Sequence, residues 1–448
     1  MKEQTLFHDT KKQITLFNTY NYASYEDIIQ QYSKEFRNLI KPKGDTCFGF
    51  WMQTLADLEL LDLELQGLTK SYYIDPINKI VDFEGDDDYV RNRVAHLELV
   101  RNKPSLYCEF VDEFDDTNAY AFHNLYPYKG KFYPRIVRTL INAFKLDLNS
   151  LILDPFNGSG TTTHEASLMG IPSIGIDITP IGVMIAELKN ELLFLNEKDL
   201  DFSYSDLIEI LNAIENKKWE HKNSTIYKLM LIIYFDTVDA FQRTSRYEKK
   251  GKTGLFIEKF QYIKDCYKKI KKIQENNKLS FAKAKIIEGD VLDLKNLISH
   301  EKKFDACITS PPYYFSIDYV GKDKIAYEYL NLDTKEIEKK YLGMKENNLK
   351  NLDSSLSYLS GFPSKVIRYY LDLKIAIENI YWALKSGGKL AIIVGDSTVE
   401  GKKIPTTIMT KRFCEEVGFK FEKLIFNPLL GVRNRAIRGE SIIICTKP

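Results

Sequence analysis

The chain has little of several features that mark common protein classes. It has six cysteines and no Cys-x-x-Cys pair, so neither a zinc ribbon nor a redox dithiol is predicted. It lacks any run of about 18 apolar residues, the length of a membrane span. Its polar start, MKEQTLFHDTKKQ, lacks the apolar core of a signal peptide. We therefore expect a cytoplasmic protein with reduced thiols and no membrane partner.

Net charge is nearly absent as well. The formal net charge is +1 over 448 residues, of which 28% are charged. Chains that bind nucleic acid are often basic overall, so any such contact here has to come from local basic patches. The 44% of hydrophobic residues suffices for a sizeable core, and the length allows two or more domains.

The pattern of apolar and polar residues predicts a doubly wound, mostly parallel α/β sheet that carries an N-terminal extension and helical insertions. Short apolar runs typical of strands alternate with patterns typical of helices. The predicted strands cover residues 151–154, 174–177, 285–287, 304–309, 389–394, 419–426 and 441–445, and the predicted helices 55–68, 161–169, 365–384 and 406–417. The predicted parts are an extension of unknown role (1–118), a cofactor half (119–196), a Lys-rich helical insertion (197–283) and a catalytic half (284–448) with an insertion at 315–363.

A glycine-rich turn follows the first strand of this predicted sheet. It reads Asp154-Pro155-Phe156-Asn157-Gly158-Ser159-Gly160-Thr161, and glycine permits a close approach of ligand to backbone. A phosphate-binding P-loop needs Gly-Lys-Ser/Thr, and the dinucleotide fingerprint needs a third glycine where Thr163 stands. Both nucleotide classes are therefore disfavoured, and a tight turn in an unrelated α/β protein is the alternative on this motif alone.

Two acidic residues extend the candidate cofactor site. Asp177 ends the second strand about 20 residues after the turn, where an acid suits the two hydroxyls of a ribose. Adenosine without a pyrophosphate cradle indicates S-adenosylmethionine. Asp290 follows the third strand and is a candidate acceptor for the adenine amino group, with a solvated loop acid as the alternative.

The segment Thr309-Ser310-Pro311-Pro312-Tyr313-Tyr314 is the strongest indication of chemistry. Two prolines make a rigid loop at the carboxyl end of a strand, where α/β sheets bind ligands. The Ser310 hydroxyl and the Pro311 carbonyl are candidate acceptors for an amino group, and Tyr313 is a candidate to stack on an extruded base. The alternative is a Pro-Pro turn that only ends the strand.

Together, the glycine turn and the Ser-Pro-Pro-Tyr loop resemble the amino-group DNA methyltransferases of restriction–modification systems. The segment His123–Pro134 resembles the part of their cofactor pocket that precedes the glycine turn, and Gly395-Asp396-Ser397 resembles a later motif beside the target base. The resemblance implies a class I S-adenosylmethionine-dependent methyltransferase fold and site-specific methylation of double-stranded DNA. A cognate restriction endonuclease acting on the same site is a further partner to consider.

The resemblance and the residue patterns together define the candidate site. The expected methyl transfer needs no metal ion, so no metal site is predicted. The predicted catalytic residues are Ser310, Pro311, Pro312 and Tyr313. The predicted cofactor-binding residues are Tyr128, Lys131, Phe132, Asp154, Phe156, Gly158, Gly160, Thr161, Asp177 and Asp290.

Ser310 resembles the N4-cytosine branch of these enzymes, whereas the N6-adenine branch more often has Asp or Asn there. Members with this serine more often place the catalytic loop first, and here the cofactor half comes first. N6-adenine methylation therefore stays open, as do RNA base methylation and a non-catalytic DNA-binding module. C5 methylation of cytosine is disfavoured because the chain has no Pro-Cys dipeptide.

The segment that reads the target is not identified by any motif. The insertion at 197–283 is one candidate, since Lys264, Lys268, Lys271 and Lys272 follow near-helical spacing. Such a row either contacts phosphates or forms a solvated helix face.

Overall fold

The structure is a computed structural model that describes residues 47–49, 54–76, 78–244, 247, 249–299, 303–313, 321, 323–344, 359, 361–399, 402–428 and 439–448. The chain forms two compact units, Met1–Cys108 and Glu109–Pro448. Within the described ranges, no helix has the length and apolar character needed to cross a membrane.

The first unit is built on a five-stranded antiparallel sheet in the order β2-β3-β1-β4-β5. The leucine-rich stretch forms the predicted helix, α3 (Leu55–Leu68), which starts with a capping box between Thr54 and Asp57. The strands were not predicted, because each is short and lacks a clear apolar alternation. The other elements are β1 (Cys47–Gly49), β2 (Ser71–Asp75), β3 (Ile80–Glu84), α4 (Asp87–Arg93), β4 (Leu97–Val100) and β5 (Lys103–Pro104), and α5 (Leu106–Phe114) follows them.

The second unit contains a seven-stranded sheet in the order β13-β14-β10-β9-β6-β7-β8. All neighbours pair in parallel except β14, which is antiparallel to both β10 and β13. This confirms the predicted doubly wound, mostly parallel sheet. The strands are β6 (Ile152–Asp154), β7 (Ser173–Asp177), β8 (Ala284–Glu288), β9 (Phe304–Thr309), β10 (Leu384–Val394), β13 (Lys420–Pro428) and β14 (Gly439–Thr446).

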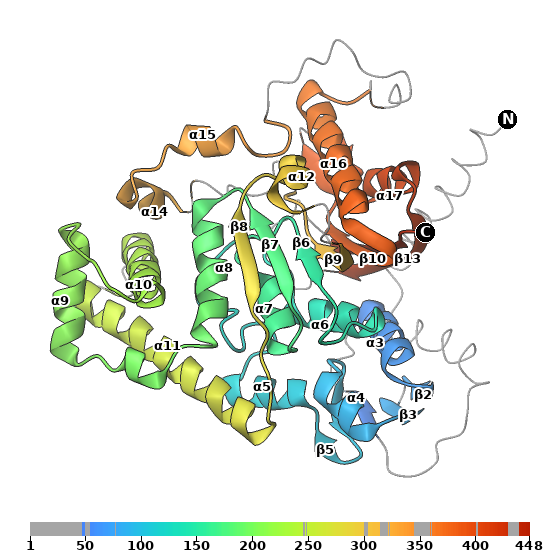
Figure 1. The fold of residues 1–448 in the computed structure, drawn as a ribbon, viewed down its shortest axis with the longest axis horizontal. Helices are drawn as coiled ribbons and strands as arrows, with labels where there is room; N and C mark the ends of the chain where they lie inside the picture. Colours follow the sequence, from blue (N-terminus) through green and yellow to red (C-terminus); the bar gives the residue numbers. More distant parts are fainter. Residues whose placement is uncertain are drawn as a thin grey trace. The chain divides into compact units, whose positions relative to one another are not determined.

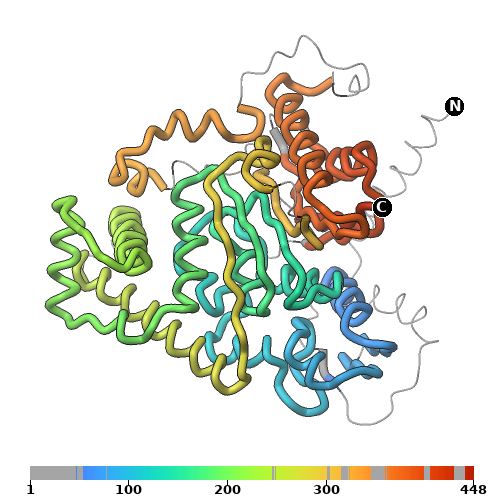
Figure 2. Tube along the Cα trace, viewed as in Figure 1, coloured from blue at the N-terminus to red at the C-terminus, as the bar shows by residue number. Residues whose placement is uncertain are grey.

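The strand order creates a switch point between β6 and β9. From β6 the chain builds the sheet in one direction through β7 and β8, and from β9 it builds in the other direction. Figure 2 shows the yellow β8 beside the green β7, although a long helical segment separates them in the chain. Ligands of open α/β sheets bind outside the carboxyl ends of the strands at such a point.

The helices that pack on this sheet form two groups. One group comprises α6 (Pro134–Ala143), α7 (Thr161–Leu168) and α8 (Pro180–Leu192), in which α7 contacts both of the others. The second group comprises α12 (Leu294–Leu297), α16 (Ser364–Ala383) and α17 (Thr406–Val417). Buried residues of the second group and of the central strands share one hydrophobic core, which includes Leu153, Cys307, Tyr370, Leu390 and Phe413.

Helices fill the stretch between α8 and β8. They are α9 (Tyr204–Glu215), α10 (Ser224–Arg243) and α11 (Gly251–Asn276), preceded by the 3-10 helix η1 (Glu197–Leu200). Figure 1 shows the three α-helices on the outer side of α8, where α10 contacts both α8 and α11. The remaining elements are η3 (Val291–Asp293), α14 (Lys324–Tyr329), α15 (Thr334–Glu338), β11 (Ser397–Val399) and β12 (Lys402–Ile404).

Candidate active site

The glycine turn lies at the switch point, between the end of β6 and the start of α7. Gly158 and Gly160 have φ angles of +49° and +80°, in the left-handed region that glycine adopts without strain. A Cβ on Gly160 would lie 2.8 Å from the Cβ of Ala186, and one on Gly158 would lie 3.3 Å from the ring of Tyr128. Position 160 therefore needs glycine for conformation and for space, whereas position 158 needs it for conformation and has little room beside Tyr128.

Asp177, at the end of β7, is bonded to this turn. Its Oδ2 accepts from the Gly158 N–H at 2.7 Å, and its Oδ1 accepts from the Thr179 N–H at 2.8 Å and from the Thr179 hydroxyl. Burial raises the pKa of the Asp177 carboxyl, and these three donors oppose that shift. The sequence motif and the acid that follows it thus form one connected structure.

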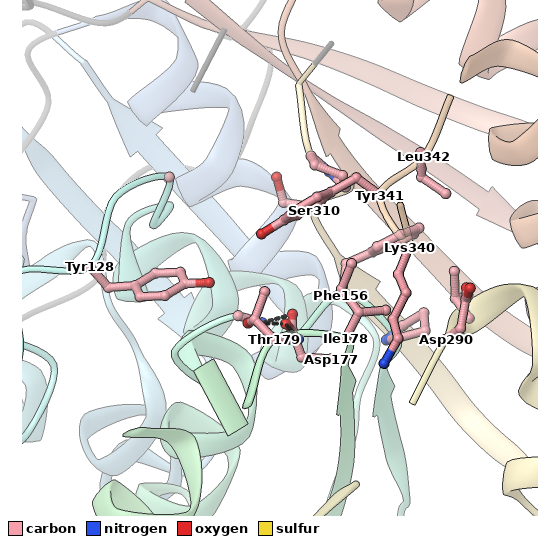
Figure 3. A pocket seen from close by; sticks show the side chains of 15 residues that line it. Tyr128, Phe156, Asp177, Ile178, Thr179, Asp290, Ser310, Lys340, Tyr341 and Leu342 are labelled. Carbon is pink, nitrogen blue, oxygen red and sulfur yellow. Dashed lines mark hydrogen bonds between the residues drawn. The ribbon is translucent and has the colours of Figure 1, made fainter. Parts of the chain in front are cut away.

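A cavity that is partly open to solvent lies beside Asp177. Five of the predicted cofactor residues line it: Tyr128, Phe156, Gly158, Asp177 and Asp290. Two of the predicted catalytic residues, Ser310 and Pro312, line the same cavity. In Figure 3, Tyr128 and Lys340 lie on opposite sides of it, with Asp177 between them.

The remaining predicted residues lie outside this lining. Lys131 donates from Nζ to the carbonyl of His123 at 2.9 Å, so it supports the backbone that leads to Tyr128. Asp154 is buried and accepts from the Thr309 hydroxyl at 2.6 Å, and burial raises its pKa to about 6. The others outside the lining are Phe132, Gly160, Thr161, Pro311 and Tyr313.

Sequence reasoning missed three residues on the far side of the cavity, Lys340, Tyr341 and Leu342. They follow α15 in the polar insertion that was predicted at 315–363. No motif marks them, and they reach the cavity only through tertiary folding. Ile178 and Thr179 were also missed, although their place directly after Asp177 is a signal that could have found them.

The Ser-Pro-Pro-Tyr loop is held by polar contacts from several elements. The Ser310 hydroxyl donates to the carbonyl of Ile393 at 2.9 Å, at the end of β10. The Tyr369 hydroxyl of α16 donates to the carbonyl of Pro312 at 3.0 Å. Tyr313 is buried, with 8% of its surface exposed, and its hydroxyl donates to Oε1 of Glu440 at 2.7 Å. Tyr314 lies outside the described residues.

The later motif also lies near this edge of the sheet. Asp396 follows β10, and its Oδ1 accepts from the N–H of Thr407 at 2.9 Å, in the first turn of α17. In the structure this carboxylate therefore has a role at the start of a helix.

A buried polar network supports the segment that precedes the glycine turn. Glu165 of α7 accepts from Arg138 Nε at 2.6 Å and from the Tyr120 hydroxyl at 2.6 Å, and the Nε2 atom of His123 lies 3.0 Å from it. Glu165 is fully buried and Arg138 is 1% exposed. The network therefore ties the segment around His123 to the helix that begins at the glycine turn.

The cavity fits S-adenosylmethionine better than a phosphorylated nucleotide. Two carboxylates, Asp177 and Asp290, line it and can meet hydroxyl or amino groups and a positive charge. Phe156 adds an apolar surface for a base. The turn has no lysine after Gly160, so the group that a P-loop uses to reach phosphates is absent there.

Comparison with known proteins agrees with this geometry. The profile of the N6/N4 DNA methylase family matches residues 2–187. The type II methyltransferase M.BsoBI of Geobacillus stearothermophilus is 24% identical over 437 residues, which cover 73% of this chain and 86% of that protein. The type II methyltransferase M.AvaI of Anabaena variabilis is 20% identical over 434 residues, covering 75% and 89% of the two chains.

A shorter match involves a protein that acts on RNA. The tRNA (guanine(10)-N2)-dimethyltransferase of Pyrococcus abyssi is 36% identical over 87 residues, which cover 19% of this chain and 25% of that protein.

The sheet order and the family match lead to one assignment. The fold is that of the class I methyltransferases, and the cofactor is S-adenosylmethionine. The chain is thus similar to the N6/N4 amino-group DNA methylases over the part that the family profile matches, residues 2–187.

Proposed function

We propose that the protein transfers a methyl group to the exocyclic N4 of cytosine in double-stranded DNA, as the modification enzyme of a restriction–modification system. The main support for cytosine as the target base is the hydrogen bond that the Ser310 hydroxyl makes. Its proton is donated to the Ile393 carbonyl, so the oxygen presents its lone pairs as an acceptor. Ser310 lines the same cavity as Asp177 and Asp290.

An acceptor at this place has a clear chemical use. An exocyclic amino group is barely basic, so the enzyme has to orient its nitrogen and hold it against the methyl donor. Ser310 accepts from one N–H without the charge or volume of an aspartate, which suits a pyrimidine. Tyr313 follows on the same loop and is proposed to stack on the base once it leaves the helix.

The cofactor site has a separate task. Bound S-adenosylmethionine supplies an electrophilic methyl group on a sulfonium. Asp177 and the Gly158 backbone are proposed to bind its ribose side, and Asp290 and Phe156 its adenine side, with Tyr128 closing one wall. The reaction needs no metal, since these residues have only to bind, orient and exclude water.

The restriction–modification role is proposed from the relatives. M.BsoBI and M.AvaI are named type II methyltransferases, and each aligns over most of its length. A cognate endonuclease that cleaves the same unmodified site is the partner that this role implies. We propose residues 197–283 as the segment that recognises the DNA sequence.

Methylation of an RNA base is the second candidate, because of the short match to the tRNA dimethyltransferase. To separate the two, the purified protein is incubated with tritium-labelled S-adenosylmethionine and either unmodified bacterial genomic DNA or bulk tRNA. We expect label in DNA. Ser310→Ala should abolish it, whereas Ser386→Ala, an exposed serine bonded to the Pro448 carbonyl, should leave it unchanged. Label in tRNA alone, or in neither, would contradict the proposal.

A further inference from the structure

Glu440 is a buried acid at the catalytic edge of the sheet that no motif marks. It is the second residue of β14, and its neighbour Ser441 pairs with Val394, the last residue of β10. Because β14 runs antiparallel to β10, its first residues lie at the carboxyl end of the parallel strands. Glu440 thus shares that end of the sheet with Ser310, whose hydroxyl is bonded to Ile393.

The carboxyl group of Glu440 is only half satisfied. Its Oε1 accepts from the Tyr313 hydroxyl at 2.7 Å, while its Oε2 is buried and has no hydrogen-bond partner within the part of the chain that the structure describes. Only 7% of the residue surface is exposed. Such a buried, unsatisfied polar atom opposes folding, so packing alone would favour an apolar residue here.

The hydrogen bond from Tyr313 to Glu440 fixes a different part of the loop from the other hydrogen bonds. Ile393 and Tyr369 fix the loop at the Ser310 side chain and at the Pro312 carbonyl, and the proline rings fix the backbone. None of these contacts sets the direction of the Tyr313 ring. The Glu440 carboxyl binds the far end of that ring, at the phenol oxygen, and so limits its rotation.

We propose that Glu440 is a positioning residue for methyl transfer, which holds the Tyr313 ring in the orientation that receives the extruded base. This inference rests on the proposed stacking role of Tyr313. A stacking platform whose orientation is fixed before the base arrives loses less freedom on binding. Glu440 itself touches neither the base nor the cofactor and acts only through Tyr313.

The test uses the full-length protein and compares kcat and KM for methyl transfer to unmodified genomic DNA. Glu440→Leu and Tyr313→Phe should each lower kcat roughly 10–100-fold, the range expected for one hydrogen bond to a charged group, without changing the KM for S-adenosylmethionine. The double variant should lose no more than either single variant. Glu440→Gln keeps an oxygen acceptor and should stay within about threefold of the wild type.

Two controls make the result specific. Glu422→Leu removes a carboxylate from β13, on the same sheet, that is bonded to Lys389 and 35% exposed, and kcat should not change. Calorimetric binding of S-adenosylmethionine to each variant shows that the protein is folded. Full activity of Glu440→Leu or of Tyr313→Phe overturns the inference, as do losses that multiply in the double variant. A wild type that methylates no DNA would overturn the proposed function as well, which distinguishes the two failures.

Discussion

Two buried glutamates, one in each half of the sheet domain, differ in how completely they are paired. Glu165 is bonded to Arg138, His123 and Tyr120. Burial by itself would raise its pKa, but the charge of Arg138 and the bonds from its other partners lower the pKa to about 2. Among the described residues, Glu440 accepts a hydrogen bond from the Tyr313 hydroxyl; burial raises the pKa of Glu440, and that bond opposes the shift only in part.

This difference in pairing leads us to assign a stabilising role to Glu165 and a functional role to Glu440. Removing one partner of a buried, paired charge is strongly destabilising, because the remaining charge is left buried and uncompensated. The Glu165 network joins the segment before the glycine turn to α7, so we assign it to the integrity of the cofactor half. The half-paired Glu440 contributes little stability, and we assign it to the orientation of Tyr313.

The largest expected effect comes from breaking the fully paired network. Arg138→Met should lower the free energy of unfolding by about 3–5 kcal/mol, because it leaves Glu165 charged and buried. Urea denaturation measures this, with Glu440→Gln as the comparison in the other half, for which we expect a change below about 1 kcal/mol. Equal losses in the two variants would remove the distinction between the two glutamates.

Next in size is the loss of the stacking ring. Tyr313→Ala should lower kcat by roughly 100-fold or more, which corresponds to about 2.7 kcal/mol of transition-state stabilisation. Binding of S-adenosylmethionine should stay nearly intact, because Tyr313 does not line the cofactor cavity. Steady-state kinetics and calorimetry on the same preparation give both quantities. A normal rate would show that Tyr313 does not act on the base.

The cofactor half is tested separately through Asp177. Asp177→Ala should weaken S-adenosylmethionine binding by about 1.5–3 kcal/mol, the loss of hydrogen bonds to a charged group. Asp305→Ala is the matched control, since this acid lies at the opposite end of β9 and accepts from the Leu151 N–H at 2.8 Å. Calorimetry that finds unchanged affinity in a folded Asp177→Ala protein would remove Asp177 from the site.

Only part of the candidate site can be predicted from the amino-acid sequence. The glycine turn and Asp177 are predictable, because a strand, a turn and the next strand follow one another in the chain and carry a recognisable pattern. Lys340, Tyr369 and Glu440 are not, because each reaches the site from a distant element and has no neighbouring motif. The fold of the sheet domain was predicted from strand and helix patterns, whereas the short strands of the first unit gave too weak an alternation.

The pH dependence of stability tests the pairing of Glu165 in a second way. The folded-state pKa of Glu165 is depressed to about 2 from an ordinary 4.5, so its contribution is present above pH 4.5 and lost as pH falls toward 2. The difference in unfolding free energy between the wild type and Glu165→Gln should therefore shrink as pH falls below 4.5. Urea titrations from pH 7 to about pH 3 test this, and a difference that grows in acid would contradict the lowered pKa.

The smallest expected effect concerns the lysines of α11. Lys264 pairs with Asp201, Lys272 pairs with Glu113, and Lys271 donates to the Leu193 carbonyl. These contacts favour the solvated-face interpretation over the phosphate-contacting one. Neutralising these three lysines together with Lys268 should therefore change the slope of log binding constant against log salt by no more than about 0.9, one phosphate contact. A decrease of about 3 or more in the magnitude of this slope would show that the α11 lysines contact DNA phosphates.

The most direct test of the central claim is the modified base itself. The protein is expressed in a host that lacks DNA methyltransferases of its own, and the genomic DNA is digested to nucleosides for mass spectrometry. We expect N4-methylcytosine in this DNA, and none when Ser310→Ala is expressed in place of the wild type. N6-methyladenine in its place would contradict the assignment of the base, and no methylated nucleoside at all would contradict the proposed function.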